Sequence, residues 1–159
     1  MAQRVLSQQA QDLIELVRCA LAGEKISKER LKTIDLAELF ALAQAQSLAA
    51  LVSFALNGQI SAEQMCPWKE VRDKSLRKNL LLDMERRELC GWMSQNGIWH
   101  MSLKGSVLKD LYPCMEMRQM SDQDILYDAA HRKAVFAHML AKGYETDSHG
   151  DTQIGRAHV

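Results

Sequence analysis

The chain has 159 residues, 47% of them hydrophobic and 25% charged, which is the composition of a soluble globular protein and not of a disordered one. Its 20 Lys and Arg balance its 20 Asp and Glu, and without a basic excess a nucleic-acid partner is possible but not favoured. The start of the chain has no continuous apolar segment typical of a secretory signal, and the four cysteines lack the spacing of a zinc site. We therefore expect a cytoplasmic protein with no membrane partner and with reduced, mostly buried thiols.

Helical patterns fill the first two-thirds of the chain. Serine caps and apolar spacing predict a helix over residues 7–23 and a short helical turn over 27–31. A capping-box pattern begins a third helix, which is expected to run over residues 35–58. Because this helix is apolar on nearly every side and uncharged over 39–56, we expect it at the centre of its bundle. Its glutamines and serines argue against a membrane span.

The longest helix is predicted to begin at Ser61 or at Pro67, since proline suits a first helical turn, and to end near Gly97. At about 1.5 Å per residue it would be roughly 45 Å long, enough to connect two subdomains. One face of this helix is apolar, and we expect that face to pack on the preceding helix. The face consists of Trp68, Val71, Leu82, Leu89 and Met93.

The hydrophobic period changes after Gly97, where an α/β unit is expected to begin. In chain order, the predicted elements are a strand at 98–103, a turn at 104–106, a short helix at 107–112, a strand at 124–127, an amphipathic helix at 129–142 and the start of a third strand at 144–146. The inward residues of the amphipathic helix are predicted to be Val135, Phe136, Met139 and Leu140. The predicted fold class is therefore α/β (α+β), with a helical region over residues 1–96 and a partial βαβα core over residues 97–153.

Two acidic residues beside the second predicted strand are candidate metal ligands. Alternate residues of a strand project from the same face, so Asp122 and Asp124 would point the same way, about 7 Å apart. Two carboxylates so placed repel each other unless a cation lies between them. Mg²⁺ prefers oxygen ligands and would bring the phosphates of a nucleotide with it.

A Gly-Ser pair after the first predicted strand is a candidate phosphate-binding turn. Gly105 lets the backbone approach a phosphate closely, and Ser106 with the start of the following helix offers hydroxyl and N–H donors. Each of the two patterns alone is more typical of a solvated turn or strand edge. The combination of the two patterns in this order is more specific than either pattern alone.

Several short motifs follow one another in the second half of the chain. They are Ser102-Leu103-Lys104-Gly105-Ser106-Val107-Leu108, Leu111-Tyr112-Pro113, Arg118, Ser121-Asp122-Gln123-Asp124-Ile125-Leu126 and an element ending in Gly-Tyr over residues 140–144. In this order they resemble a poorly characterised nucleotidyltransferase family of the DNA-polymerase-β-like superfamily, whose members also have a helical region before the motifs. The resemblance covers roughly residues 8–146, and the combined motif is specific.

The resemblance implies transfer of a nucleoside monophosphate from an NTP to an acceptor, with release of pyrophosphate. It implies that Asp122 and Asp124 are the catalytic carboxylates and hold two Mg²⁺ ions, and that Gly105 and Ser106 cradle the triphosphate. The sequence leaves open whether the acceptor is a protein, an RNA or a small molecule. Such sites work by positioning the substrates and by neutralising developing charge.

Two basic residues, Lys104 and Arg118, also match family positions and are assigned to nucleotide binding. For Arg118, a salt bridge that orients an aspartate is an equal alternative. Lys104 stands where the superfamily's turn usually has glycine or serine, which leaves the geometry of the phosphate cradle open.

The superfamily's third carboxylate comes from a later strand and has no clear counterpart here. The candidates are Asp128, Glu145, Asp147 and Asp151, which all come too early in the chain. Residues 154–159, Ile-Gly-Arg-Ala-His-Val, back-translate to ATC GGA AGA GCA CAC GTC, which resembles a short-read sequencing adapter. We therefore expect a non-native tail at 154–159 and a natural protein that is longer and is truncated here.

The main alternative is a catalytically inactive helical interaction module whose metal site is incomplete. Titration with Mg²⁺-NTP separates this module from an enzyme. A nucleotide-sugar glycosyltransferase is a weaker alternative, because the chain lacks the large nucleotide-binding domain of such enzymes. The basic stretch 69–78 has interleaved acidic residues, so a solvated helix face is favoured over an RNA-binding strip.

Overall fold

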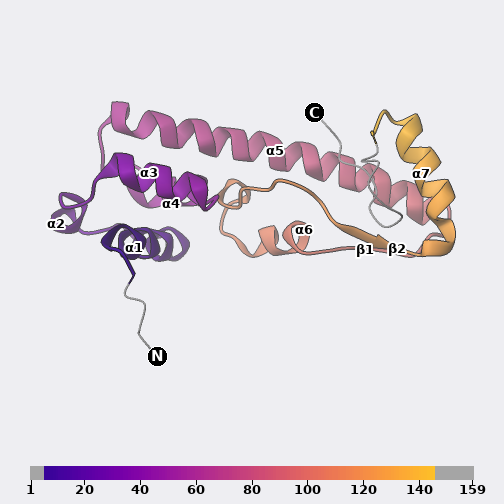
Figure 1. Cartoon of the computed structure of the whole chain (residues 1–159), viewed down its shortest axis with the longest axis horizontal. Coiled ribbons are helices and arrows are strands. Elements are labelled where there is room, and N and C mark those ends of the chain that lie inside the picture. Colours follow the sequence, from indigo (N-terminus) through magenta and orange to yellow (C-terminus); the bar gives the residue numbers. More distant parts are fainter. Residues whose placement is uncertain (1–5, 146–159) are drawn as a thin grey trace. The chain divides into compact units, whose positions relative to one another are not determined.

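The computed structural model describes residues 6–145 and is mostly helical, with one small antiparallel sheet (Figure 1). The helices and strands are α1 (Gln8–Ala22), α2 (Lys28–Leu31), α3 (Leu36–Ala45), α4 (Ala49–Leu56), α5 (Ala62–Gln95), β1 (His100–Ser102), α6 (Gly105–Leu108), β2 (Ile125–Tyr127) and α7 (Arg132–Ala141). Short 3₁₀ turns lie at η1 (Lys109–Leu111), η2 (Met115–Met117) and η3 (Ala129–His131). The predicted α+β class with a predominantly helical N-terminal region is confirmed.

The described residues form two compact units. The first unit contains residues 6–81 and Leu108–Ser121, and the second contains Leu82–Val107 and residues 122–145. The long helix α5 contributes residues to both. The domain boundaries expected at 96/97 and 153/154 stay predictions.

Helix α4 is the centre of the first unit. It packs against α1 and α3, and every residue from Ala49 to Leu56 except Phe54 is buried. No charged side chain is present in α4 or in the neighbouring part of α3, so both helices can enter an apolar core without burying an ion. The prediction that the uncharged stretch 39–56 is central is confirmed for α4, whereas residues 44–47 around the end of α3 are exposed. In the described part of the chain, no helix has the length and apolarity needed to cross a bilayer.

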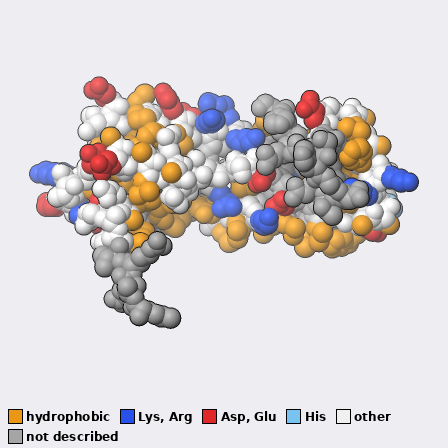
Figure 2. All heavy atoms as spheres, in the orientation of Figure 1, with side chains coloured by type: hydrophobic (Ala, Val, Ile, Leu, Met, Phe, Trp, Pro, Cys, Tyr) orange, Lys and Arg blue, Asp and Glu red, His pale blue; other side chains and the backbone are white. Residues whose placement is uncertain are grey.

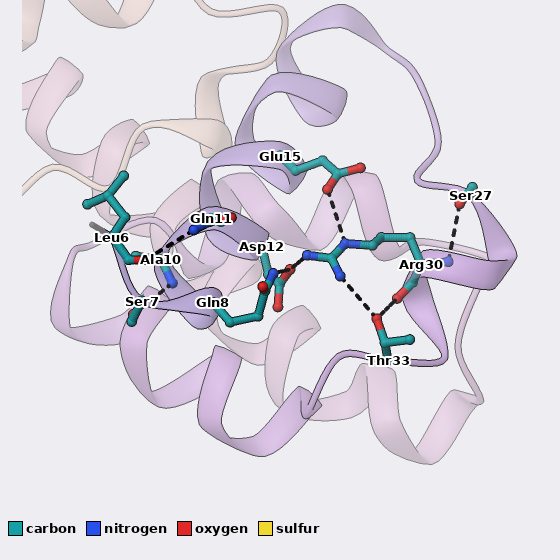
Figure 3. Close-up of polar contacts among 10 residues, drawn as sticks. All are labelled: Leu6, Ser7, Gln8, Ala10, Gln11, Asp12, Glu15, Ser27, Arg30 and Thr33. Atoms are coloured by element: carbon teal, nitrogen blue, oxygen red, sulfur yellow. Dashed lines mark hydrogen bonds and ion pairs between the residues drawn. The ribbon is translucent and has the colours of Figure 1, made fainter.

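Arg30 ties α2 to α1 through a small polar network (Figure 3). Its guanidinium pairs with the carboxylate of Asp12, which is only 4% exposed, and with the more exposed Glu15 at 3.4 Å. A further N–H of Arg30 donates to the hydroxyl of Thr33 at 3.2 Å. A buried carboxylate without such a cation would be costly, so this pair fixes how α2 lies on α1.

The single helix expected over residues 35–58 is two helices, and this prediction is wrong. Ser47 has a left-handed backbone conformation (φ 55°), and the N–H of Leu48 turns back to the carbonyl of Ala43 at 2.8 Å, which ends α3. Leu48 offers no side-chain cap to α4. Instead, the side-chain carbonyl of Gln119 accepts a hydrogen bond from the N–H of Ala50 at 2.8 Å. The cap therefore comes from a residue 69 positions away, which local patterns cannot reveal.

Helix α5 begins at Ala62, with Ser61 as its cap, and not at Pro67. The hydroxyl of Ser61 accepts from the N–H of Gln64 at 3.2 Å, and the side chain of Gln64 accepts from the N–H of Ser61 at 3.0 Å, forming a reciprocal capping box. Pro67 lies inside the helix. The next residue, Trp68, packs its ring edge-on against Phe40, with centroids 4.8 Å apart.

The apolar face of α5 is divided between two cores, so the expectation that all of it packs on the preceding helix is wrong. Trp68 and Val71 join the core of the first unit, whereas Leu89 and Met93 join a second core with Ile98. The physical reason is length, because α5 has 34 residues and α3 and α4 have 10 and 8. A helix of this length extends beyond the surface that two short helices can cover.

The second unit is built on a two-stranded antiparallel sheet. The register pairs His100 with Tyr127, Met101 with Leu126 and Ser102 with Ile125. Ile125 and Tyr127 pack on the second core together with Val135 of α7, whereas Met101 and Leu126 are exposed on the other face. Figure 2 shows hydrophobic side chains on this part of the surface.

Helix α7 packs on α5 within the second unit. The ring of His138 stacks on Trp92, with centroids 4.0 Å apart and planes within 9°. Lys142, just after α7, forms an ion pair with Glu88 of α5.

The predicted boundaries in the second half need corrections. Both strands have three residues and are shorter than expected. The helix expected over 107–112 is α6 followed by the 3₁₀ turn η1, and the one over 129–142 begins with η3. Leu140, expected to face inward, is 47% exposed. Tyr144 and Glu145 belong to no strand, and Thr146 lies outside the described residues.

The four cysteines are free, but the expectation that they are mostly buried is wrong. Cys66 is exposed, and Cys19, Cys90 and Cys114 are only partly buried. Burial and the nearby carboxylates of Glu15 and Glu24 raise the pKa of the Cys19 thiol above its ordinary value.

Candidate functional site

Antiparallel pairing brings Lys104 to Asp124 in the second unit. The ladder that pairs Ser102 with Ile125 continues by one bond, because the N–H of Leu103 donates to the carbonyl of Asp124 at 2.9 Å. Lys104 follows directly, and its ammonium nitrogen lies 2.8 Å from the Oδ2 atom of Asp124. Two motif residues that are twenty positions apart in the chain thus form an ion pair.

Lys104 also makes the turn between β1 and α6. Its backbone is left-handed (φ 46°), a conformation that costs a non-glycine residue about 1–2 kcal/mol. The carbonyl of Lys104 accepts a hydrogen bond from the N–H of Val107 at 3.1 Å, which closes the first turn. The predicted turn at 104–106 is therefore tight, and Gly105 is the first residue of α6.

The two predicted metal ligands lie just before β2 and not within it. Asp124 is half-buried and Asp122 is exposed. Asp124 and the exposed Leu126 lie on the same side of the extended chain, opposite the packed Ile125. The hydrogen bond and the charge of Asp124 raise the pKa of Lys104 above its ordinary value, and the charge of Asp122 adds to this rise. Both carboxylates therefore act on the same cation.

Ser106 has a buried hydroxyl group that is suited to a ligand. The residue is 4% exposed, and its Oγ atom has no hydrogen-bond partner among the described residues. The Nε2 atom of Gln123, which stands between the two aspartates in sequence, is also buried without a partner in the described chain. Buried donors of this kind normally find a partner, so both atoms are candidates to bind a phosphate oxygen.

The donor set at Asp122 and Asp124 fits Mg²⁺. Within residues 6–145, no group of three or more His, Cys, Asp or Glu is arranged to hold a metal ion. Mg²⁺ does not need such a cage, since it is usually held by one or two carboxylates together with substrate phosphates and water. Asp124, which already pairs with the ammonium of Lys104, and Asp122, two residues before it, are carboxylates of this kind.

Of the candidates for a third carboxylate, the two in the described part of the chain, Asp128 and Glu145, do not join this pair in a group able to hold a metal ion. Asp128 accepts a hydrogen bond from the N–H of Ala130 at 2.9 Å and caps η3. Glu145 is exposed at the end of the described chain. Asp147, Asp151 and the tail at 154–159 lie outside the described residues.

Arg118 is held by its backbone in the first unit. Its carbonyl accepts hydrogen bonds from the Nδ2 atom of Asn79 at 2.9 Å and from the hydroxyl of Ser75 at 3.4 Å. The role of its guanidinium, whether toward a nucleotide or toward an aspartate, stays a prediction. Ser75 and Asn79 were missed in the sequence, although two short polar residues at i, i+4 in a long helix are a usable signal.

One shallow hollow of the second unit is not suited to a nucleotide. It offers about 20 Å³ of room, little more than one water needs. The residues around it are Glu85, Glu88, Leu89, His138, Met139, Lys142 and Tyr144. Lys142 and Tyr144 of the Gly-Tyr element lie around it, but the Gly105-Ser106 turn and the aspartate pair do not.

Comparison with known protein families gives a match over residues 32–158, to a family described as uncharacterised nucleotidyltransferase. The matched segment contains the turn at Lys104 and the aspartate pair. Comparisons with curated proteins and with solved structures gave no match. Because the family model covers well over half of the sequence, the chain belongs to this uncharacterised nucleotidyltransferase family.

Proposed function

We propose that the protein transfers a nucleoside monophosphate from a Mg²⁺-bound NTP to an acceptor. The observation that carries this proposal is the ion pair between Lys104 of the turn and Asp124, together with the buried Ser106 hydroxyl two residues after Lys104, which has no hydrogen-bond partner among the described residues. An anionic pair and a set of donors lie on neighbouring segments of one unit. A metal–triphosphate complex needs both kinds of group.

In this proposal, Asp122 and Asp124 hold Mg²⁺, with two ions expected in the complete site. When bound, Mg²⁺ neutralises charge on the triphosphate and on the leaving group. Ser106 donates its hydroxyl to a phosphate oxygen, and Gly105 allows close approach of the backbone. Lys104 adds positive charge for the nucleotide, and the assignment of Arg118, a residue of the first unit, to nucleotide binding stays a prediction.

The transfer exchanges one bond for another at the α-phosphorus. A nucleophilic atom of the acceptor attacks it, and the bond to the bridging oxygen of the β-phosphate breaks. Pyrophosphate leaves with that electron pair, and the acceptor's proton is released to water. The acceptor is a protein, an RNA or a small molecule. The balanced net charge and the free thiols favour a cytoplasmic setting without a nucleic-acid preference.

Calorimetric titration with ATP, GTP, CTP and UTP in the presence of Mg²⁺ tests the proposal. The unaltered chain should bind at least one of them, and Asp122→Asn and Asp124→Asn should abolish the metal-dependent part. The matched control is Asp110→Asn, which removes an exposed carboxylate of the first unit and should leave binding unchanged. Absence of metal-dependent binding by the unaltered chain would instead support the inactive interaction module.

A further inference from the structure

The side chain of Lys104 stands where a metal ion would meet Asp124. Its ammonium nitrogen is 2.8 Å from the Oδ2 atom, and the charge of Asp122 acts on the same ammonium. A cation bound to Asp124 would therefore face a like charge at very short range. The metal and the ammonium cannot both keep this position.

Burial among the described residues does not fix the ammonium there. The Lys104 side chain is 76% exposed, and its flexible stem allows other positions, so the ion pair is a weak surface pair. The backbone, by contrast, is fixed by the Leu103–Asp124 ladder bond and by the closed turn to Val107. The chain thus holds the base of the side chain and leaves its tip able to move.

We propose that Lys104 is an exchangeable counter-ion of the metal site. It neutralises Asp124 while no metal is bound, and it moves to the triphosphate when the metal–nucleotide complex arrives. This inference rests on the proposed function. Its consequence is that metal and nucleotide assist each other: the metal displaces the ammonium, and the nucleotide supplies the negative charge that receives it.

Binding of Mn²⁺, followed by electron paramagnetic resonance, tests the exchange without any need for an acceptor. Lys104→Met should bind Mn²⁺ alone about two- to fivefold more tightly than the unaltered chain, because the competing ion pair is gone. The same variant should bind the Mn²⁺–NTP complex about tenfold more weakly, because a charge-assisted bond to the triphosphate is lost. Opposite changes for the two ligands are the signature of the exchange.

Two further variants make the test specific. Lys142→Met removes another exposed lysine that is paired with a carboxylate, Glu88, and should change neither affinity. Lys104→Gly suits the left-handed backbone and also removes the ammonium, so it should reproduce both changes seen for Lys104→Met.

The outcomes separate this inference from the proposed function. If the unaltered chain binds Mn²⁺–NTP but the Lys104 variants bind Mn²⁺ alone equally or more weakly, the counter-ion inference is overturned and the proposed function stands. If the unaltered chain binds neither Mn²⁺ nor Mn²⁺–NTP, both are overturned.

Discussion

Substitution of Asn79 tests how residues 115–118, which precede the aspartate pair, are held in place. It is 1% exposed, and its Nδ2 atom donates to the carbonyls of Met115 at 2.7 Å and of Arg118 at 2.9 Å. The hydroxyl of Ser75, one turn earlier, donates to the carbonyl of Glu116 at 2.9 Å. These bonds tie a segment without regular strands or long helices to α5 inside the first unit.

The cost of Asn79→Ala can be worked out from these contacts. The carbonyl of Met115 loses its side-chain donor, which costs about 2 kcal/mol, and that of Arg118 loses one of two donors, which costs about 1 kcal/mol. The Oδ1 atom of Asn79 is buried without a partner in the described chain, so its removal returns about 1 kcal/mol. The expected net loss of folding free energy is therefore about 2 kcal/mol.

Urea denaturation followed by circular dichroism measures this loss. The matched control is Asn96→Ala, because Asn96 also donates to a carbonyl, that of Trp92 at 2.8 Å, but is exposed. The control should cost less than about 0.5 kcal/mol. If Asn79→Ala cost no more than the control, the reasoning that these bonds hold the segment would be refuted.

Substitutions at three other residues have defined outcomes. Arg30→Ala should lower the free energy of unfolding by about 2 kcal/mol in urea, because it leaves the buried carboxylate of Asp12 without its cation. The cost is no larger because the Arg30 side chain is itself 31% exposed, and a loss under about 0.5 kcal/mol would contradict this reasoning. Lys104→Gly should be about 1 kcal/mol more stable than Lys104→Ala in the same assay, because alanine keeps the cost of the left-handed backbone; equal stabilities would count against that cost. The hydrogen bond and charge of Lys142 lower the pKa of Glu88 below 4.5, so this pair should stabilise the fold above pH 4.5 and lose that effect as the pH falls through the lowered value. The stability difference between the unaltered chain and Glu88→Gln should therefore vanish in acid; a difference that persists unchanged would refute the assignment.

Local capping patterns allowed the helix starts to be predicted. The side chains of Ser7, Ser27 and Asp35 accept hydrogen bonds from N–H groups of α1, α2 and α3, as expected. These interactions span only two or three residues, so the sequence contains all the information they need. The central position of α4 followed in the same way from composition alone.

Features that depend on distant partners could not be predicted. The break at Ser47 is accompanied by a cap from Gln119, and the division of the α5 face depends on which other helices are long enough to cover it. Neither fact is contained in the pattern of residues around it. The length of a predicted helix is therefore less certain than its starting residue.

In the candidate site, too, local motifs could be predicted and contacts between distant residues could not. The Gly105-Ser106 turn and the aspartate pair were recognisable as motifs, because their chemistry depends on short spacings. The ion pair between Lys104 and Asp124 was not, since it follows from the antiparallel register of two strands. Ser106 was expected to bind phosphate, but its burial emerged only from the fold.

The central claim is that metal and nucleotide bind at the turn and the aspartate pair. Nuclear magnetic resonance with Mn²⁺ and an NTP locates them most directly, because the paramagnetic ion broadens the signals of nearby backbone amides. Our account predicts broadening first at residues 104–106 and 122–125, and none there in the Asp122→Asn, Asp124→Asn double variant. Broadening centred elsewhere, for example at Glu85 and Glu88, or no broadening at all, would contradict it.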